Sequence, residues 1–87
     1  MDKKQVKLFF KISDKEVLER GFKKLKLTDE ELKISIKLTK EWSEEMIAQE
    51  MNMSKRTIQR RKKRIYEKVF ETLNGWEELE EKIKGGN

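Results

Sequence analysis

The side chains with the clearest chemical capacity in this sequence are the cations of segment 55–64. This segment holds seven Lys and Arg residues and no acidic residue, whereas the net charge of the whole chain is +5. A surface that serves only solubility mixes charges of both signs. A single segment that holds more than the whole excess of positive charge therefore favours a polyanionic partner.

Segment 55–64 falls in a predicted helix that begins at Lys55 and reaches about Leu73. With about 100° of rotation per residue, one side of this helix is an apolar stripe, formed by Ile58, Ile65, Val69 and Leu73. The opposite side is basic and polar, with Arg56, Arg60 and Lys63 at its centre and Gln59 and Arg64 beside them. Lys62 falls inside the apolar stripe and Arg61 at its edge, so these two cations are the least suited to bind a partner.

The residues before Lys55 predict a second helix and a tight turn. Ser43 is a typical N-cap residue, and Ala48 is a small residue where a closely packed neighbouring helix would need one. Asn52 tolerates the left-handed backbone conformation of a turn, and Ser54 can cap the helix that follows. Met46, Ile47 and Met51 supply the apolar side. This pattern is typical of a helix-turn-helix.

Segment 28–73, about half of the chain, resembles the DNA-binding domain of LuxR-type regulators, region four of bacterial sigma factors and small phage transcriptional activators. The residues that carry the likeness are Leu27-Thr28, Trp42-Ser43, Ile47-Ala48, Met53-Ser54, Arg56-Thr57-Ile58 and Ile65-Tyr66-Glu67-Lys68-Val69. The resemblance implies a four-helix domain whose third helix reads the major groove. The chain departs from the family pattern in two places, with Glu41 where Gly is usual and Lys62 where an apolar residue is usual.

The DNA-binding residues that motif, charge and resemblance together predict are Ser54, Lys55, Arg56, Thr57, Gln59, Arg60, Lys63 and Arg64. Arg and Gln side chains can form paired hydrogen bonds to base edges in the major groove, and Lys suits phosphates. No other cluster of polar residues suggests an active site, so we expect a protein that is not an enzyme.

The remaining pattern predicts further helices. Ser13 with Glu16 and Thr28 with Glu31 have capping-box spacing, which places helices up to about Leu25 and from Thr28 to near Glu41. We expect Leu32, Ile36 and Leu38 to point inward from the second of these. Residues 2–12 fit a strand or a helix, and we favour the helix. Asn74-Gly75 is a stop signal, after which Trp76, Leu79 and Ile83 fit a last short helix.

These elements predict one all-α domain over residues 1–87. Its tetrahelical helix-turn-helix core spans about 28–84, and segment 1–26 adds one or two helices that either pack on the core or mediate homodimerisation. The chain has no Cys and no His, which excludes disulfides, Cys or His zinc sites and the usual nucleophile–base pairs. No segment is apolar enough for a membrane span. We therefore expect a soluble cytoplasmic protein of bacterial or phage origin, with no metal, cofactor or small-molecule ligand.

The function that these patterns favour is sequence-specific binding of double-stranded DNA by a transcription regulator. Two alternatives remain open. One is a sigma-like module that binds RNA polymerase or another regulator, suggested by the acidic segment 77–81 and by Lys62. The other is a phage packaging subunit, similar to a small terminase, that recognises viral DNA.

Overall fold

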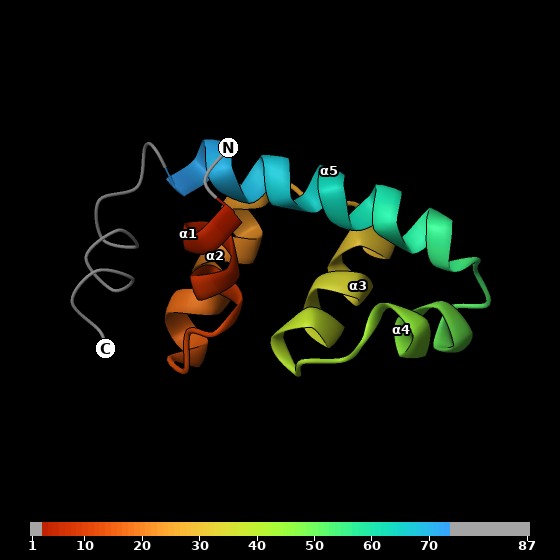
Figure 1. Ribbon diagram of the computed structural model, residues 1–87. Helices are drawn as coiled ribbons and strands as arrows, with labels where there is room; N and C mark the ends of the chain where they lie inside the picture. Colours follow the sequence, from red (N-terminus) through yellow and green to blue (C-terminus); the bar gives the residue numbers. More distant parts are fainter. Residues whose placement is uncertain (1–2, 74–87) are drawn as a thin grey trace.

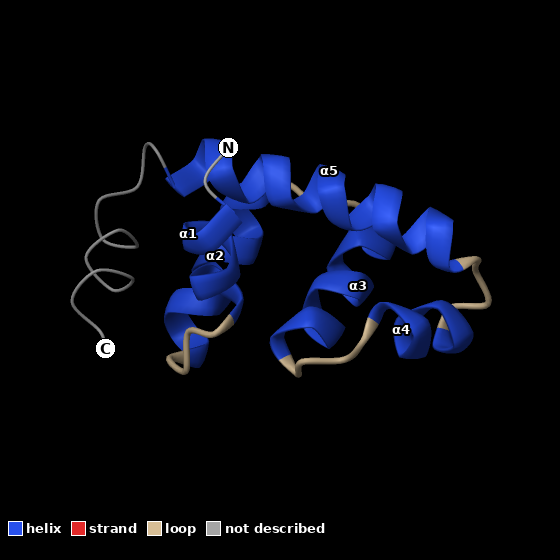
Figure 2. Cartoon of the chain, viewed as in Figure 1, coloured by secondary structure: helices blue, strands red, loops and turns tan. Residues whose placement is uncertain are grey.

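One long helix crosses all the others in this structure, a computed structural model that describes residues 3–73 (Figure 1). The helices are α1 (Lys3–Phe10), α2 (Lys15–Leu25), α3 (Asp29–Thr39), α4 (Glu44–Glu50) and α5 (Lys55–Leu73). Helix α5 contacts each of the other four, and no strand occurs in residues 3–73 (Figure 2). The prediction of an all-α fold is confirmed, and so is the helix expected within residues 2–12. The helix predicted around Trp76, Leu79 and Ile83 lies outside the described residues.

The core forms along the apolar stripe of α5. The four predicted stripe residues are all buried, with at most 2% of their surface exposed: Ile58, Ile65, Val69 and Leu73. The other helices meet this stripe with buried apolar side chains, namely Val6, Phe9, Phe10, Val17, Leu25, Ile34, Ile47 and Ala48. Helices α1 and α2 therefore pack on the same core as α5, because they contribute five of these eight residues.

The sequence signals for helix starts are mostly confirmed. Thr28 and Glu31 form the reciprocal capping box at the start of α3, and the Ser43 hydroxyl accepts a hydrogen bond from the Met46 amide. The exception is α2, whose cap is Asp14 and not the predicted Ser13. The Asp14 carboxylate accepts hydrogen bonds from the amides of residues 16 and 17. A carboxylate one position later competes successfully with the serine because it can accept from two amides and favours the positive end of the helix dipole.

Helices α3 and α4 end in the same way. After α3, the Trp42 amide donates to the Lys37 carbonyl and the Glu41 amide donates to the Leu38 carbonyl. The corresponding bonds after α4 run from Met53 to Ala48 and from Asn52 to Gln49. This pair of bonds is the Schellman motif, which requires a left-handed residue. Glu41 (φ 60°) and Asn52 (φ 56°) hold that position, as predicted for Asn52.

Glu41 occupies a backbone conformation that costs a residue with a β-carbon about 1 kcal/mol. We expect Glu41→Gly to raise the free energy of unfolding by about that amount, measured by urea denaturation. Glu41→Ala is the matched control, because it removes the same carboxylate and keeps the β-carbon. An equal gain in both variants would place the cost in the charge and contradict a backbone origin.

The inward side of α3 differs from the prediction. Leu32 and Ile36 are 36% and 40% exposed, whereas Ile34 is fully buried together with Ser35 and Glu31. Leu38 is partly buried. The inward side of α3 also carries Glu31, which forms an ion pair with Lys68 of α5 at 2.7 Å. This contact joins residues 37 positions apart, so the local apolar pattern could not reveal it.

Ser35 has a fully buried hydroxyl for which the described part of the chain offers no hydrogen-bond partner. A buried polar group without a partner costs free energy that an apolar group of similar shape does not. We therefore expect Ser35→Ala to leave the free energy of unfolding unchanged or to raise it by about 1 kcal/mol. Urea denaturation measures this difference, and a loss of more than about 1 kcal/mol would mean that the hydroxyl has a structural role.

Candidate nucleic-acid interface

Four cations form one exposed stripe along the N-terminal half of α5. Arg56, Arg60, Lys63 and Arg64 are all exposed, and their spacing of four, seven and eight positions from Arg56 places them on one face of the helix. None of the four forms an ion pair with another residue between positions 3 and 73. The stripe therefore presents four uncompensated positive charges to solvent.

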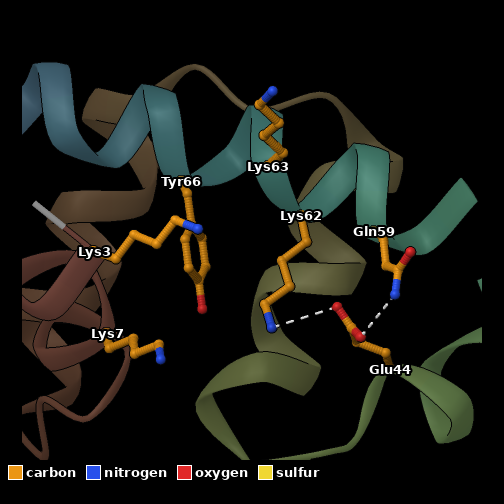
Figure 3. A pocket seen from close by; sticks show the side chains of 7 residues that line it. All are labelled: Lys3, Lys7, Glu44, Gln59, Lys62, Lys63 and Tyr66. Carbon is orange, nitrogen blue, oxygen red and sulfur yellow. Dashed lines mark hydrogen bonds and ion pairs between the residues drawn. The ribbon is translucent and has the colours of Figure 1, made fainter. Parts of the chain in front are cut away.

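The cations beside the stripe on the α4 side are paired with acids. Lys55 contacts Glu45 at 3.2 Å, and Lys62 contacts Glu44 at 3.6 Å. The Gln59 side-chain amide donates to the other oxygen of Glu44 at 3.4 Å (Figure 3). Both acids lie in the first turn of α4, where the helix dipole also favours them. Of the predicted DNA-binding residues, Lys55 and Gln59 are thus engaged within the protein.

The cations on the other side of the stripe are paired with α3. The Arg61 guanidinium lies 2.9 Å from Glu30, and Lys68 lies 2.7 Å from Glu31. Arg61 and Lys62, the two cations that the helical pattern marked as least suited to bind a partner, are both in ion pairs. Acids of α3 and α4 thus neutralise the flanks of the basic segment and leave its centre free.

Ser54 and Thr57 lie together at the N-terminal end of α5, where the stripe begins. The Ser54 hydroxyl accepts a hydrogen bond from the Thr57 amide at 3.1 Å, and the two hydroxyls lie 2.9 Å apart. Ser54 caps α5 in this way, as predicted from its position. One of the two hydroxyls donates to the other, so the pair still offers one free O–H donor at the exposed end of the helix.

Glu31 is the most deeply buried acid beside the interface, with 2% of its surface exposed. Burial alone would raise the pKa of its carboxyl. The hydrogen bonds from Lys68 and from the Thr28 amide outweigh this effect, so the pKa lies below the ordinary value of 4.5. Glu31 is therefore ionised at neutral pH, and it fixes α3 to α5 behind the exposed stripe.

Sequence reasoning did not identify a cleft beside the stripe. The cleft has a volume of about 290 Å³ and lies between α1 and α5, where Lys3 and Lys7 face Tyr66 and Lys62 (Figure 3). One signal for it was present in the sequence: Lys3 and Lys7 are spaced four apart on one side of α1, and Lys11, four positions further, directly follows that helix. This spacing does not indicate which helix the lysine row faces.

Other kinds of site are not visible in the described ranges. Residues 3–73 contain no group of three acidic, Cys or His side chains that could hold a metal ion. No helix in the same range has the length and apolar character that a membrane span requires. No protein-family model matches the chain, and no curated protein or solved structure matches it either.

Proposed function

We propose that this chain is a sequence-specific double-stranded DNA-binding transcription regulator, in which α4 and α5 form a helix-turn-helix and α5 enters the major groove. The observation that carries the proposal is a stripe of four cations that pair with no acid of residues 3–73 and lie between flanks that the protein neutralises itself: Arg56, Arg60, Lys63 and Arg64. A helix face that is only solvated does not require exposed cations between neutralised flanks. Phosphates and guanine base edges, in contrast, bind to such cations.

The dimensions of α5 support the same proposal. Arg56 and Arg64 are eight residues apart, which corresponds to about 12 Å along a helix axis. The major groove of B-DNA is about 12 Å wide and admits one α-helix, because the diameter of a helix with its side chains is about 10–12 Å. The basic residues lie in the N-terminal half of α5, and recognition helices contact bases with their N-terminal residues. The resemblance of segment 28–73 to LuxR-type and sigma region four domains supports this docking as well.

The experiment that tests the proposal is selection of bound sequences from a random duplex DNA pool by the purified full chain. A sequence reader enriches one motif, and the symmetry and spacing of its half-sites report whether a dimer binds. Arg60→Ala should change the selected motif at a cost of roughly 1–3 kcal/mol, and so should Gln59→Ala, provided that the Gln59 amide exchanges Glu44 for a base edge on binding. If both variants select the same motif as wild type, the proposal that α5 recognises the base sequence is contradicted.

Salt dependence provides an independent test of DNA contact. With about five phosphate contacts, the logarithm of affinity should fall with the logarithm of salt concentration at a slope of about −4.5. Fluorescence anisotropy of a labelled duplex measures this slope. A flat response would contradict a phosphate-binding role for the stripe.

A second candidate function is contact with a protein such as RNA polymerase. One observation favours it: Leu32, Ile36 and Met46 are large apolar residues with 36%, 40% and 50% of their surface exposed. Purified polymerase should then be retained by the wild-type chain without DNA, and a Leu32→Ser/Ile36→Ser variant should lose that retention. Sedimentation separates both candidates from a packaging subunit, which would form a ring.

A further inference from the structure

We propose that the cleft between α1 and α5 binds a backbone phosphate of the duplex that α5 reads, so that α1 forms a second part of the DNA interface. This inference rests on the proposed function and extends it to residues outside segment 28–73. The likeness to known DNA-binding domains does not cover α1, which begins at Lys3. Three features of the cleft favour a phosphate: its charge, one rigid hydrogen-bond donor and its position beside the stripe.

The cleft is strongly positive. Four lysines and one acid line it, namely Lys3, Lys7, Lys62, Lys63 and Glu44. The remaining lining residues are Gln59 and Tyr66. Glu44 is already shared between Lys62 and Gln59. Lys3 and Lys7 are exposed and form no ion pair with any residue of the described range. An anion that enters the cleft therefore meets at least two ammonium groups that no carboxylate of the described residues neutralises.

Tyr66 supplies a fixed donor inside the cleft. Its ring stacks on the buried Phe10, with ring centroids 5.6 Å apart and an angle of 27° between the planes. The Lys62 ammonium lies 5.4 Å from the same ring. The hydroxyl extends between Lys7 and Lys62 (Figure 3) and has no hydrogen bond to another residue in positions 3–73. A phenol held in this way can donate to a phosphate oxygen with little loss of side-chain entropy.

The position of the cleft selects DNA as the source of the phosphate. Gln59 and Lys63 belong both to the lining of the cleft and to the predicted base-reading side of α5. The walls of the major groove are phosphate backbones, so a helix in the groove has a strand on each side. A neighbouring hollow shares Lys7, Lys62 and Tyr66 with the cleft and adds Lys11. The row formed by Lys3, Lys7 and Lys11 thus runs alongside α5, as the backbone of one DNA strand would.

The test compares a Lys3→Ala/Lys7→Ala variant with wild type for binding of the selected duplex across a range of salt concentrations. Loss of one phosphate contact should flatten the logarithmic salt slope by about 0.9 and weaken binding at 0.1 M salt by about tenfold. The selected sequence should stay the same, because phosphates carry no base identity. Tyr66→Phe should weaken binding several-fold while retaining the ring. Lys15→Ala/Lys23→Ala removes the same charge from exposed positions on α2 and should leave the slope unchanged.

The outcomes separate the two proposals. If wild type binds a selected duplex and the Lys3→Ala/Lys7→Ala variant keeps its slope, the role of the cleft is overturned and the proposed function stands. If wild type binds no duplex, both are overturned. An equal loss in the α2 control would assign the effect to net charge and also overturn the role of the cleft. Inorganic phosphate or ATP that shifts the Gln59 side-chain amide resonance at micromolar concentration would make a free ligand, and not DNA, the occupant.

Discussion

Replacing the four stripe residues together, in the variant Arg56→Gln/Arg60→Gln/Lys63→Gln/Arg64→Gln, should weaken DNA binding by about three orders of magnitude at 0.1 M salt. Each of the four cations contributes either a phosphate contact, with about 0.9 of the logarithmic salt slope, or a paired hydrogen bond to a base edge worth about 1–3 kcal/mol. Glutamine retains good helix propensity, so α5 should still form. Fluorescence anisotropy measures the affinity, and circular dichroism checks the helix content.

The control for this variant changes net charge equally in another place. Lys15, Lys23, Lys33 and Lys40 are exposed on or next to α2 and α3, and their replacement by Gln also lowers the net charge from +5 to +1. The control should retain most of the affinity, because charges beyond a Debye length of about 10 Å are screened at 0.1 M salt. A comparable loss in both variants would mean that DNA responds to the total charge of the protein and not to the stripe.

Lys68→Met should produce the largest loss of stability among single substitutions of the ion pairs. Glu31 has a side chain that is 3% exposed, and Lys68 is its ammonium partner at 2.7 Å. Removing one member of a buried ion pair leaves the other charge without a partner. This lowers the free energy of unfolding by about 3–5 kcal/mol when both members of the pair are fully buried. Lys68 is 27% exposed, so we expect a smaller loss, about 2–3 kcal/mol. Urea denaturation measures it.

The double variant Glu31→Gln/Lys68→Met tests the cause of that loss. An amide at position 31 can still accept the hydrogen bond from the Thr28 amide, and it carries no charge. The double variant should therefore be more stable than Lys68→Met alone. If it is less stable, the loss comes from packing of the Lys68 stem and not from the unpaired carboxylate.

The pH dependence of stability should follow from the same pair. The pKa of Glu31 is lower in the folded protein than the ordinary 4.5, so the unfolded chain binds more protons in this range. The stability that Glu31 contributes is then fully present above pH 4.5 and is lost as the pH falls towards and through the folded pKa. Lys68→Met should lose less stability on acidification than wild type, and an identical pH profile for both would contradict the role of Lys68.

The positions of the helices could be read from the sequence because their signals are local. Capping residues such as Thr28 and Ser43 act within one turn, and the apolar spacing of α5 identifies its buried side. The inward side of α3 was predicted wrongly because it carries Glu31, whose partner Lys68 is far away in sequence. Acidic residues are almost never buried unless they are paired, so a sequence pattern does not predict an inward acid when its partner is not known.

The candidate interface was predictable only in part for the same reason. The helical pattern separated Arg61 and Lys62 from the other cations of segment 55–64. It could not show that Lys55 and Gln59 are held by acids of α4, since these contacts span 10 and 15 positions. It also could not place α1 beside α5, because an amphipathic helix of eight residues can pack in several ways. Tertiary packing of α1 decides that Lys3 and Lys7 face Tyr66.

The acids that pair with Lys55, Arg61 and Lys62 have a consequence for how a DNA-binding domain would find its site. Of the seven cations in segment 55–64, four form no ion pair with another residue in positions 3–73 and can attract phosphates at random positions along a genome. Attraction to random sequence is almost entirely electrostatic, and it competes with the target at a very large number of places. A protein that neutralises its own flanking charges spends less time on irrelevant sequence, and the advantage of its target over the background is correspondingly larger.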